Sequence, residues 1–329
     1  MRGVTFADIL TARRRIGGAV RRTPLAFSDS LSERCGVPVH LKFEHHQITG
    51  AFKLRGATNA ILAMDDAARA AGVAAASTGN HGRGVAHAAK VAGARAIVCL
   101  SRLVPKNKVE AIEALGAEVR ITGASQDEAQ AEVDRLVAEE GMTMISPFED
   151  PYVIAGQGTL GLEIVEDLPE AETVLVPLSG GGLISGIAIA VKTALPKARV
   201  VGLTMEHGAA MHASLKAGHP VEVEEVPTLA DSLGGGIGLD NVHTFSTVRE
   251  LVDDVVLLSE EEIAEGIRHA YWKERQVVEG AAAVGIAALL TGRIEARGPT
   301  AALLSGCNID MEVHRRLVSG EMVRAGEAA

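Results

Sequence analysis

The chain has 329 residues, enough for about two domains of ordinary size. Hydrophobic residues make up 47% of the sequence and charged residues 22%, a composition that excludes intrinsic disorder and disulfide-scaffold proteins. The formal net charge of −10 and the aromatic content of 3% argue against nucleic acid as a partner, because phosphate backbones would be repelled and few side chains could stack on bases.

The sequence predicts neither a membrane span nor secretion. Its longest apolar stretch, residues 280–290, is about half of what a bilayer-spanning helix needs. The arginine-rich N-terminus contains Asp8 and no apolar signal region, which favours a first helix of the fold over a targeting peptide. Cys35, Cys99 and Cys307 form no C-x-x-C pair, so we expect reduced thiols and a cytoplasmic protein.

Short apolar runs alternate with helical stretches along the chain, which is typical of βαβ units. The predicted strands cover residues 39–43, 72–76, 96–100, 118–121, 173–176, 200–203 and 300–304. The predicted helices cover residues 65–71, 81–92, 106–115, 126–139, 182–194 and 260–272. Because most strand runs are apolar throughout, we expect an α/β fold with open, mostly parallel sheets. No linker divides the chain, so a second domain would be inserted or interwoven.

Glycine-rich turns mark candidate phosphate sites. Residues 156–161 match G-x-G-x-x-G, but the acidic residue expected about twenty positions later is missing, which favours a helix start packed closely on its neighbours over NAD binding. Residues 179–183 follow a predicted strand and begin a helix, so their backbone could bind a single phosphate; a tight packing turn is the alternative. Ser305 would lie at the carboxyl end of a strand, where open α/β sheets bind ligands.

Lys53 follows a glycine turn at the start of a predicted helix. The helix field and partial burial would lower its pKa and make the amine a better nucleophile, whereas a solvated helix lysine is the alternative. Residues 77–81 connect the predicted strand at 72–76 to the next predicted helix, and the free backbone N–H groups of this turn could bind a carboxylate. His81, His87 and Cys99 have no recognisable metal-ligand spacing, so no metal site is predicted.

Together these segments resemble fold-type II pyridoxal 5′-phosphate (PLP) enzymes, the group of serine/threonine dehydratases and serine racemases. The family's lysine segment, T-G-S-F-K-x-R-G-A, corresponds to residues 49–57 with Ala51 in place of the serine, and its S-x-G-N-H segment to residues 77–81. Residues 52–59, 178–183 and 230–240 are most similar to hydroxyectoine utilization dehydratases. Ser179 and Ser232 replace glycines of the usual family pattern, which marks a subfamily.

The resemblance implies a tryptophan synthase β-like fold and a homo-oligomer, most simply a dimer. Residues 1–50 and 151–329 would form a large PLP-binding domain, and residues 51–150 a smaller inserted α/β domain. Lys53 would form the Schiff base and then take the substrate Cα proton. Phe52 would pack beside the pyridine ring, Asn80 would bond the 3′-oxygen and Ser305 would meet the ring nitrogen. The phosphate would be bound by Gly180, Gly181, Gly182 and Leu183, and the substrate carboxylate by Ser77, Thr78, Gly79, Asn80 and His81.

The implied reaction is PLP-dependent elimination of water from a small β-hydroxy amino acid, in hydroxyectoine degradation. Two alternatives are other dehydratases, namely an L-serine/L-threonine ammonia-lyase or a hydroxyaspartate dehydratase. A third is a racemase that uses Thr78 as an acid or base on the second face of the substrate, and a fourth is a binding module without chemistry. Asp127 and Glu128 could pair with the distal amine of a diamino substrate, or simply complement a helix N-terminus. A divalent-cation site known among relatives would be lost or weak, because Glu206 is the single carboxylate in the corresponding loop.

Overall fold

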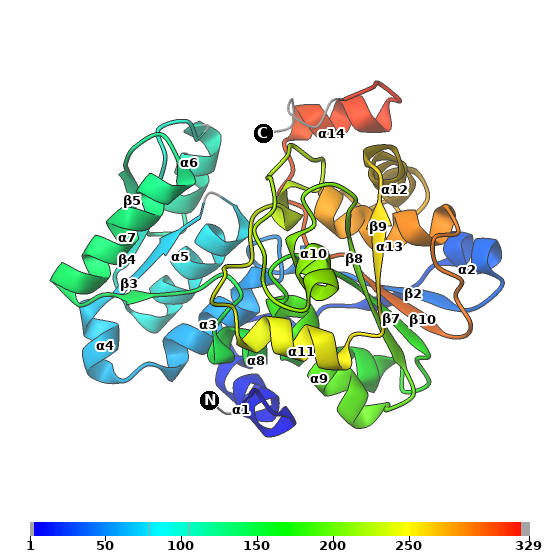
Figure 1. The fold of residues 1–329 in the computed structure, drawn as a ribbon, viewed down its shortest axis with the longest axis horizontal. Helices are drawn as coiled ribbons and strands as arrows, with labels where there is room; N and C mark the ends of the chain where they lie inside the picture. Colours follow the sequence, from blue (N-terminus) through cyan, green and yellow to red (C-terminus); the bar gives the residue numbers. More distant parts are fainter. Residues whose placement is uncertain (1–2, 78, 105, 324–329) are drawn as a thin grey trace.

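The computed structural model describes residues 3–77, 79–104 and 106–323, and two parallel-rich sheets organise them (Figure 1). The six-stranded sheet has the order β1 (Leu25–Phe27), β2 (Val39–Lys42), β10 (Thr300–Leu303), β7 (Thr173–Pro177), β8 (Arg199–Met205) and β9 (Asp254–Leu258). The four-stranded sheet has the order β5 (Glu118–Ile121), β4 (Ala96–Leu100), β3 (Val73–Ala76) and β6 (Thr143–Met144). Every pairing except β1 with β2 is parallel, which confirms the expected fold class.

Helices cover both sheets. They are α1 (Phe6–Ile16), α2 (Asp29–Cys35), α3 (Lys53–Ala63), α4 (Asp66–Ala71), α5 (Asn80–Ala92), α6 (Lys106–Glu113), α7 (Gln126–Glu140), α8 (Pro151–Asp167), α9 (Gly182–Ala194), α10 (Ala210–Ala217), α11 (His243–Leu251), α12 (Glu260–Trp272), α13 (Gly280–Leu290) and α14 (Met311–Val318), with 3-10 turns η1 (Glu44–His46) and η2 (Asp231–Leu233). Local capping explains several helix starts, such as the capping box of Ser125 and Glu128 on α7. Across the described residues, no helix is both long and apolar enough to cross a membrane.

The sequence pattern predicted every interior strand of the two sheets and one edge strand, the partly exposed β5. All residues of β7, β10 and β4 are buried, as their apolar runs indicated. The missed strands β1, β6 and β9 lie at sheet edges and are partly exposed. β1 and β6 have only three and two residues, too few to show a pattern, whereas β9 contains an apolar run at residues 255–258 that the sequence prediction missed. The four-stranded sheet is built entirely from residues 73–144, within the proposed inserted domain; the boundaries 51–150 stay a prediction.

The G-x-G-x-x-G segment lies inside α8 rather than at a helix start. The helix begins earlier because Asp150 caps it and Pro151 occupies its first turn. Its glycines permit close helix packing: a Cβ on Gly156 would lie 2.7 Å from the Arg55 carbonyl oxygen, and one on Gly161 would lie 2.7 Å from the Ala190 Cβ. The expectation of close packing is therefore right, and the expected position at a helix start is wrong.

Candidate active site

Lys53 is the first residue of α3 and is partly buried. Its Nζ donates a hydrogen bond to the Pro147 carbonyl oxygen at 2.6 Å and lies 5.3 Å from the centroid of the Phe52 ring. Burial lowers the pKa of Lys53 to about 8, so a substantial fraction of the amine is neutral near physiological pH. The expectation of a helix-start lysine with a lowered pKa matches this environment.

A backbone connection brings the segment before Lys53 against the chain after β10. Phe52 donates its backbone N–H to the Ser305 carbonyl oxygen at 3.0 Å, and Cys307 donates to the Gly50 carbonyl oxygen at 2.9 Å. Gly50 has φ +76°, and a Cβ there would lie 2.9 Å from Asn308 Oδ1, so the turn requires glycine. Ser305, 2% exposed and two residues beyond β10, therefore lies beside the lysine turn.

Gly180, Gly181 and Gly182 connect β7 to α9, as the sequence predicted. Gly181 has φ +89°, and a Cβ there would lie 2.9 Å from the Thr244 side chain. A Cβ on Gly182 would lie 2.8 Å from the Phe148 carbonyl oxygen. The turn thus has room for backbone only, next to helix N–H groups that have no partner within the helix. Such a cradle is suited to a phosphate group.

Ser77 follows β3, and Asn80 and His81 are the first two residues of α5, while Thr78 falls outside the described residues. His81 is buried, and its Nε2 lies 2.7 Å from the Ile145 carbonyl oxygen. Burial and the nearby Lys53 charge lower the pKa of His81 to about 3, so this imidazole is neutral. Gly79 precedes α5 without a side-chain cap, which leaves the first helix N–H groups available to an anion.

The start of α7 lies beside this loop, because Gln126 Nε2 donates to the Ala76 carbonyl oxygen at 2.9 Å. Glu128 Oε2 accepts hydrogen bonds from the backbone N–H groups of Ala124 and Ser125 at 2.6 and 3.1 Å. Its carboxylate therefore caps its own helix. Asp127 is exposed in the same turn.

Asn80 is joined to two residues to which the sequence analysis gave no role, Glu279 and Asn308. Its Nδ2 donates to Glu279 Oε1 at 2.7 Å, and its Oδ1 accepts from Asn308 Nδ2 at 2.6 Å. Glu279 is 4% exposed, and burial together with the charge of Asp231 raises its pKa to about 7. Residues 279 and 308 are far from residue 80 in the sequence, so only the tertiary contacts show that they act together with Asn80.

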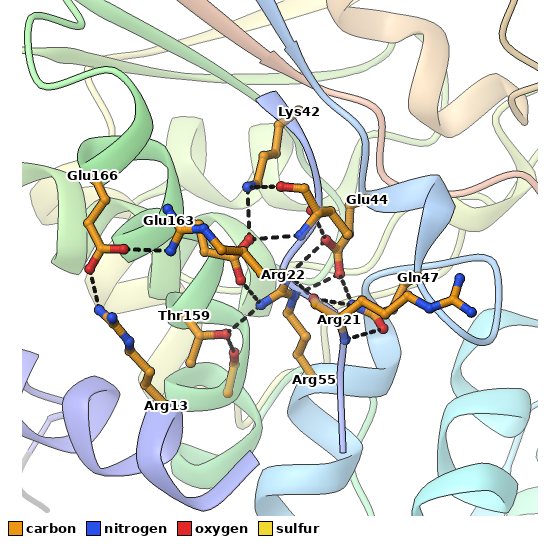
Figure 2. A network of polar contacts seen from close by, with 12 residues as sticks. Arg13, Arg21, Arg22, Lys42, Glu44, Gln47, Arg55, Thr159, Glu163 and Glu166 are labelled. Carbon is orange, nitrogen blue, oxygen red and sulfur yellow. Dashed lines mark hydrogen bonds and ion pairs between the residues drawn. The ribbon is translucent and has the colours of Figure 1, made fainter. Parts of the chain in front are cut away.

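A buried ionic network anchors α3 through Arg55, two residues after Lys53 in the sequence (Figure 2). Arg55, 1% exposed, lies 2.7 Å from Glu44 Oε1 through Nε and 2.6 Å from Glu163 Oε1 through Nη1. Glu163 Oε2 also lies 2.8 Å from Lys42 Nζ, which is fully buried. The network joins α3 to η1, β2 and α8, so the start of α3 has a fixed position relative to the six-stranded sheet. Sequence reasoning did not identify it.

Among the described residues, no group of three or more His, Cys, Asp or Glu side chains could hold a metal ion. The donors near Lys53 are instead an amine, a neutral imidazole, an amide and backbone N–H groups. With the glycine cradle, this set fits an organic cofactor that carries a phosphate and an aldehyde.

Comparison with known proteins agrees with this site. The family described as pyridoxal-phosphate dependent enzyme matches residues 16–306. A Sinorhizobium fredii protein that carries a threonine dehydratase name is 60% identical over 325 residues, 98% of both chains. L-threonine ammonia-lyase of Thermotoga maritima is 42% identical over 324 residues, 98% of this chain and 80% of that protein.

Solved structures show the same relationship. The structure of maize serine racemase has a TM-score of 0.91 and 34% sequence identity, over 97% of this chain and 98% of that one. The expected cofactor and enzyme class, PLP and a PLP-dependent lyase, are confirmed. From residue 16 to residue 306, and in the fold as a whole, the chain belongs to the family of pyridoxal-phosphate-dependent enzymes.

Proposed function

We propose that this enzyme eliminates water from a small β-hydroxy amino acid of the threonine type and releases a keto acid and ammonia. The observation that carries the proposal is the Lys53 amine, desolvated at the start of α3 beside a glycine cradle. The similarity to proteins named for threonine dehydratase and L-threonine ammonia-lyase supports the same reaction. A binding module without chemistry would have no use for a lysine held in this state.

The cofactor would be bound by residues from segments that lie far apart in the sequence. Lys53 Nζ would hold it covalently, the backbone at residues 180–183 would bind its phosphate, and Phe52 would pack beside the ring. Asn80 would donate to the 3′-oxygen, and the Ser305 hydroxyl would meet the pyridine nitrogen. When bound, the cofactor supplies a conjugated ring that accepts negative charge developing at the substrate Cα.

The reaction then needs a base and a carboxylate site. Once an incoming amine releases Lys53, its Nζ is positioned to take the Cα proton, and its low pKa suits that role near neutral pH. The backbone of residues 77–81, which opens α5, would bind the substrate carboxylate and orient the Cα–H bond. Loss of the β-hydroxyl as water completes the elimination.

For the substrate we propose a β-hydroxy diamino acid from hydroxyectoine breakdown. The exposed Asp127 carboxylate at the start of α7 would pair with the distal amine, since α7 contacts the end of β3 through Gln126. Asp127→Asn should then reduce catalytic efficiency on 3-hydroxy-2,4-diaminobutyrate and leave threonine turnover unchanged. Glu128→Gln serves as the comparison, because it disturbs the cap of α7. Equal losses on both substrates would assign both acids to the helix end.

Racemisation is the second candidate, favoured by the similarity to maize serine racemase. It would require Thr78 to act as an acid or base on the face of the substrate opposite Lys53. Thr78→Ala should abolish the D-amino acid product and retain elimination if both activities exist. Absence of any D-product from the unaltered enzyme would exclude this candidate.

The decisive experiment is chemical trapping of the holoenzyme. Borohydride reduction should fix the cofactor on Lys53, and tryptic mapping should find it there. Lys53→Ala should fold, as judged by circular dichroism, and carry no trapped cofactor. A label on Lys42 or Lys108 instead would overturn the assignment. Light scattering on the same sample measures the proposed homo-oligomer.

A further inference from the structure

We propose that Glu279 is a positioning residue that sets the orientation of the Asn80 side-chain amide, so that an N–H rather than the carbonyl oxygen faces the cofactor's 3′-oxygen. The inference rests on the proposed function, in which Asn80 contacts that oxygen. Glu279 itself lies one contact farther away, behind Asn80.

The Glu279 carboxylate is directed at Asn80 and Asn308 rather than at its own helix. Glu279 is the N-cap residue of α13, yet its side chain caps none of that helix's N–H groups. Its Oε2 accepts from the backbone N–H of Asn308 at 3.0 Å, while Oε1 accepts from Asn80. A Cβ on Gly306 would lie 2.6 Å from Oε1, so the carboxylate is tightly enclosed.

Hydrogen-bond capacity then determines which way the Asn80 amide points. An ionised carboxylate only accepts, so the Asn80 NH₂ group must face Glu279. Asn308 Nδ2 donates both to Asn80 Oδ1 and to the Thr49 carbonyl oxygen at 3.0 Å, which fixes the other side of the amide. Glu279 takes one of the two Asn80 N–H groups, and the remaining contact of Asn80 Nδ2, to Ser232 Oγ, is long at 3.5 Å. One N–H is thus left for a ligand.

Replacing Glu279 by Gln disturbs this order without removing volume. A Gln side chain offers one acceptor and one donor where the carboxylate offers two acceptors. The backbone N–H of Asn308 can only donate, so it requires the Gln oxygen as its acceptor. The Gln NH₂ group then faces Asn80. Two NH₂ groups then face each other, and a flip of the Asn80 amide would instead set its NH₂ against Asn308 Nδ2, so neither orientation satisfies both neighbours. The Asn80 N–H is then no longer held toward the 3′-oxygen.

Other ionisable groups also face Glu279 and have to be distinguished from it. Asp231 of η2 raises its pKa, and Arg83 of α5 and Cys307 interact with it electrostatically. None of these three contributes a hydrogen bond to the Asn80 side chain within the described part of the chain. Asp231→Asn changes the local charge and removes no direct partner of Asn80. The oxygen of the new Asn side chain can still accept from Ser232 as Asp231 Oδ1 does, so this variant is the matched control.

The test compares absorption spectra of the holoenzymes well above pH 7, because Glu279, whose pKa is about 7, is then mostly ionised in the unaltered protein. The long-wavelength band of a lysine-bound cofactor reports a deprotonated 3′-oxygen, and a short-wavelength band reports a protonated one. Glu279→Gln should lower the ratio of the two bands by about tenfold, the factor expected for losing one hydrogen bond to a charged oxygen. Asp231→Asn should keep the ratio of the unaltered enzyme.

A second variant approaches the same amide from its other side. Asn308→Asp places an acceptor against Asn80 Oδ1 and should shift the ratio in the same direction, and it provides the test if Glu279→Gln does not fold. An unchanged ratio in whichever of these variants folds and carries cofactor on Lys53 would overturn the role of Glu279. Absence of trapped cofactor on Lys53 in the unaltered enzyme would instead overturn the proposed function.

Discussion

Arg55 Nη1 lies 2.6 Å from Glu163 Oε1, and this buried ion pair joins the helix that begins at Lys53 to α8. The same guanidinium contacts Glu44, so one cation bridges two carboxylates. The ion pairs of Arg55 with Glu44 and Glu163 therefore hold the start of α3, and with it Lys53, in position. Removing the cation would leave Glu44 buried without a cationic partner, while Glu163 would keep its contact with Lys42.

Arg55→Met should therefore lower the free energy of unfolding by about 3–5 kcal/mol. Urea denaturation followed by circular dichroism measures this loss. Arg293→Met is the control, because Arg293 is half exposed beside Glu262 and its ion pair should contribute at most about 1 kcal/mol. Equal losses of unfolding free energy in the two variants would show that the buried network contributes no more to stability than an exposed ion pair.

The pH dependence of cofactor attachment should follow Lys53. Burial lowers its pKa from 10.5 to about 8, so the neutral amine increases as pH rises through about 8. The initial rate of covalent cofactor attachment to the cofactor-free chain should rise with that midpoint. The unfolded chain binds the extra proton between pH 8 and 10.5, so stability of the cofactor-free chain should also rise with pH in this window. A midpoint near the free lysine value would contradict the burial argument.

Ser305 should influence which product forms. In the proposed site its neutral hydroxyl would lie opposite the pyridine nitrogen and favour an unprotonated ring, which would withdraw electrons less than a ring paired with Asp. Ser305→Asp should raise the ratio of transamination to elimination by roughly tenfold or more, since a charged hydrogen bond contributes about 1.5–3 kcal/mol. Ser305→Cys, which stays neutral and similar in size, should keep the original ratio. Product analysis by mass spectrometry measures both, and unchanged partitioning in Ser305→Asp would remove Ser305 as the tuning residue.

Removal of divalent cations should have no effect. The loop after β8 offers Glu206, an exposed carboxylate 3.4 Å from His207 Nε2, and hard cations need several oxygen ligands. Dialysis against a chelator should leave both activity and Tm as they were. A marked fall in either, reversed by adding magnesium or calcium, would reveal a site that the loop sequence did not indicate.

Local sequence signals determined much of the fold. The strand at Ala96–Leu100 and the helix at Gly182–Ala194 have the bounds that the pattern predicted, because a continuous apolar run and a glycine turn act over a few residues. The position of Lys53 at a helix start was also predictable, as was the Gly180–Gly182 connection. Resemblance added the cofactor and the reaction class, which the comparisons support.

The tertiary structure decided what depends on distant partners. Asn80 and Glu279 are 199 residues apart in sequence, and Arg55 and Glu163 are 108 apart, so no local pattern pairs them. The glycines of α8 resembled a dinucleotide motif until their contacts with α3 and α9 showed close packing. The lowered pKa of Lys53 and the raised pKa of Glu279 follow from loss of water around each group, and only the folded chain determines which side chains lose it.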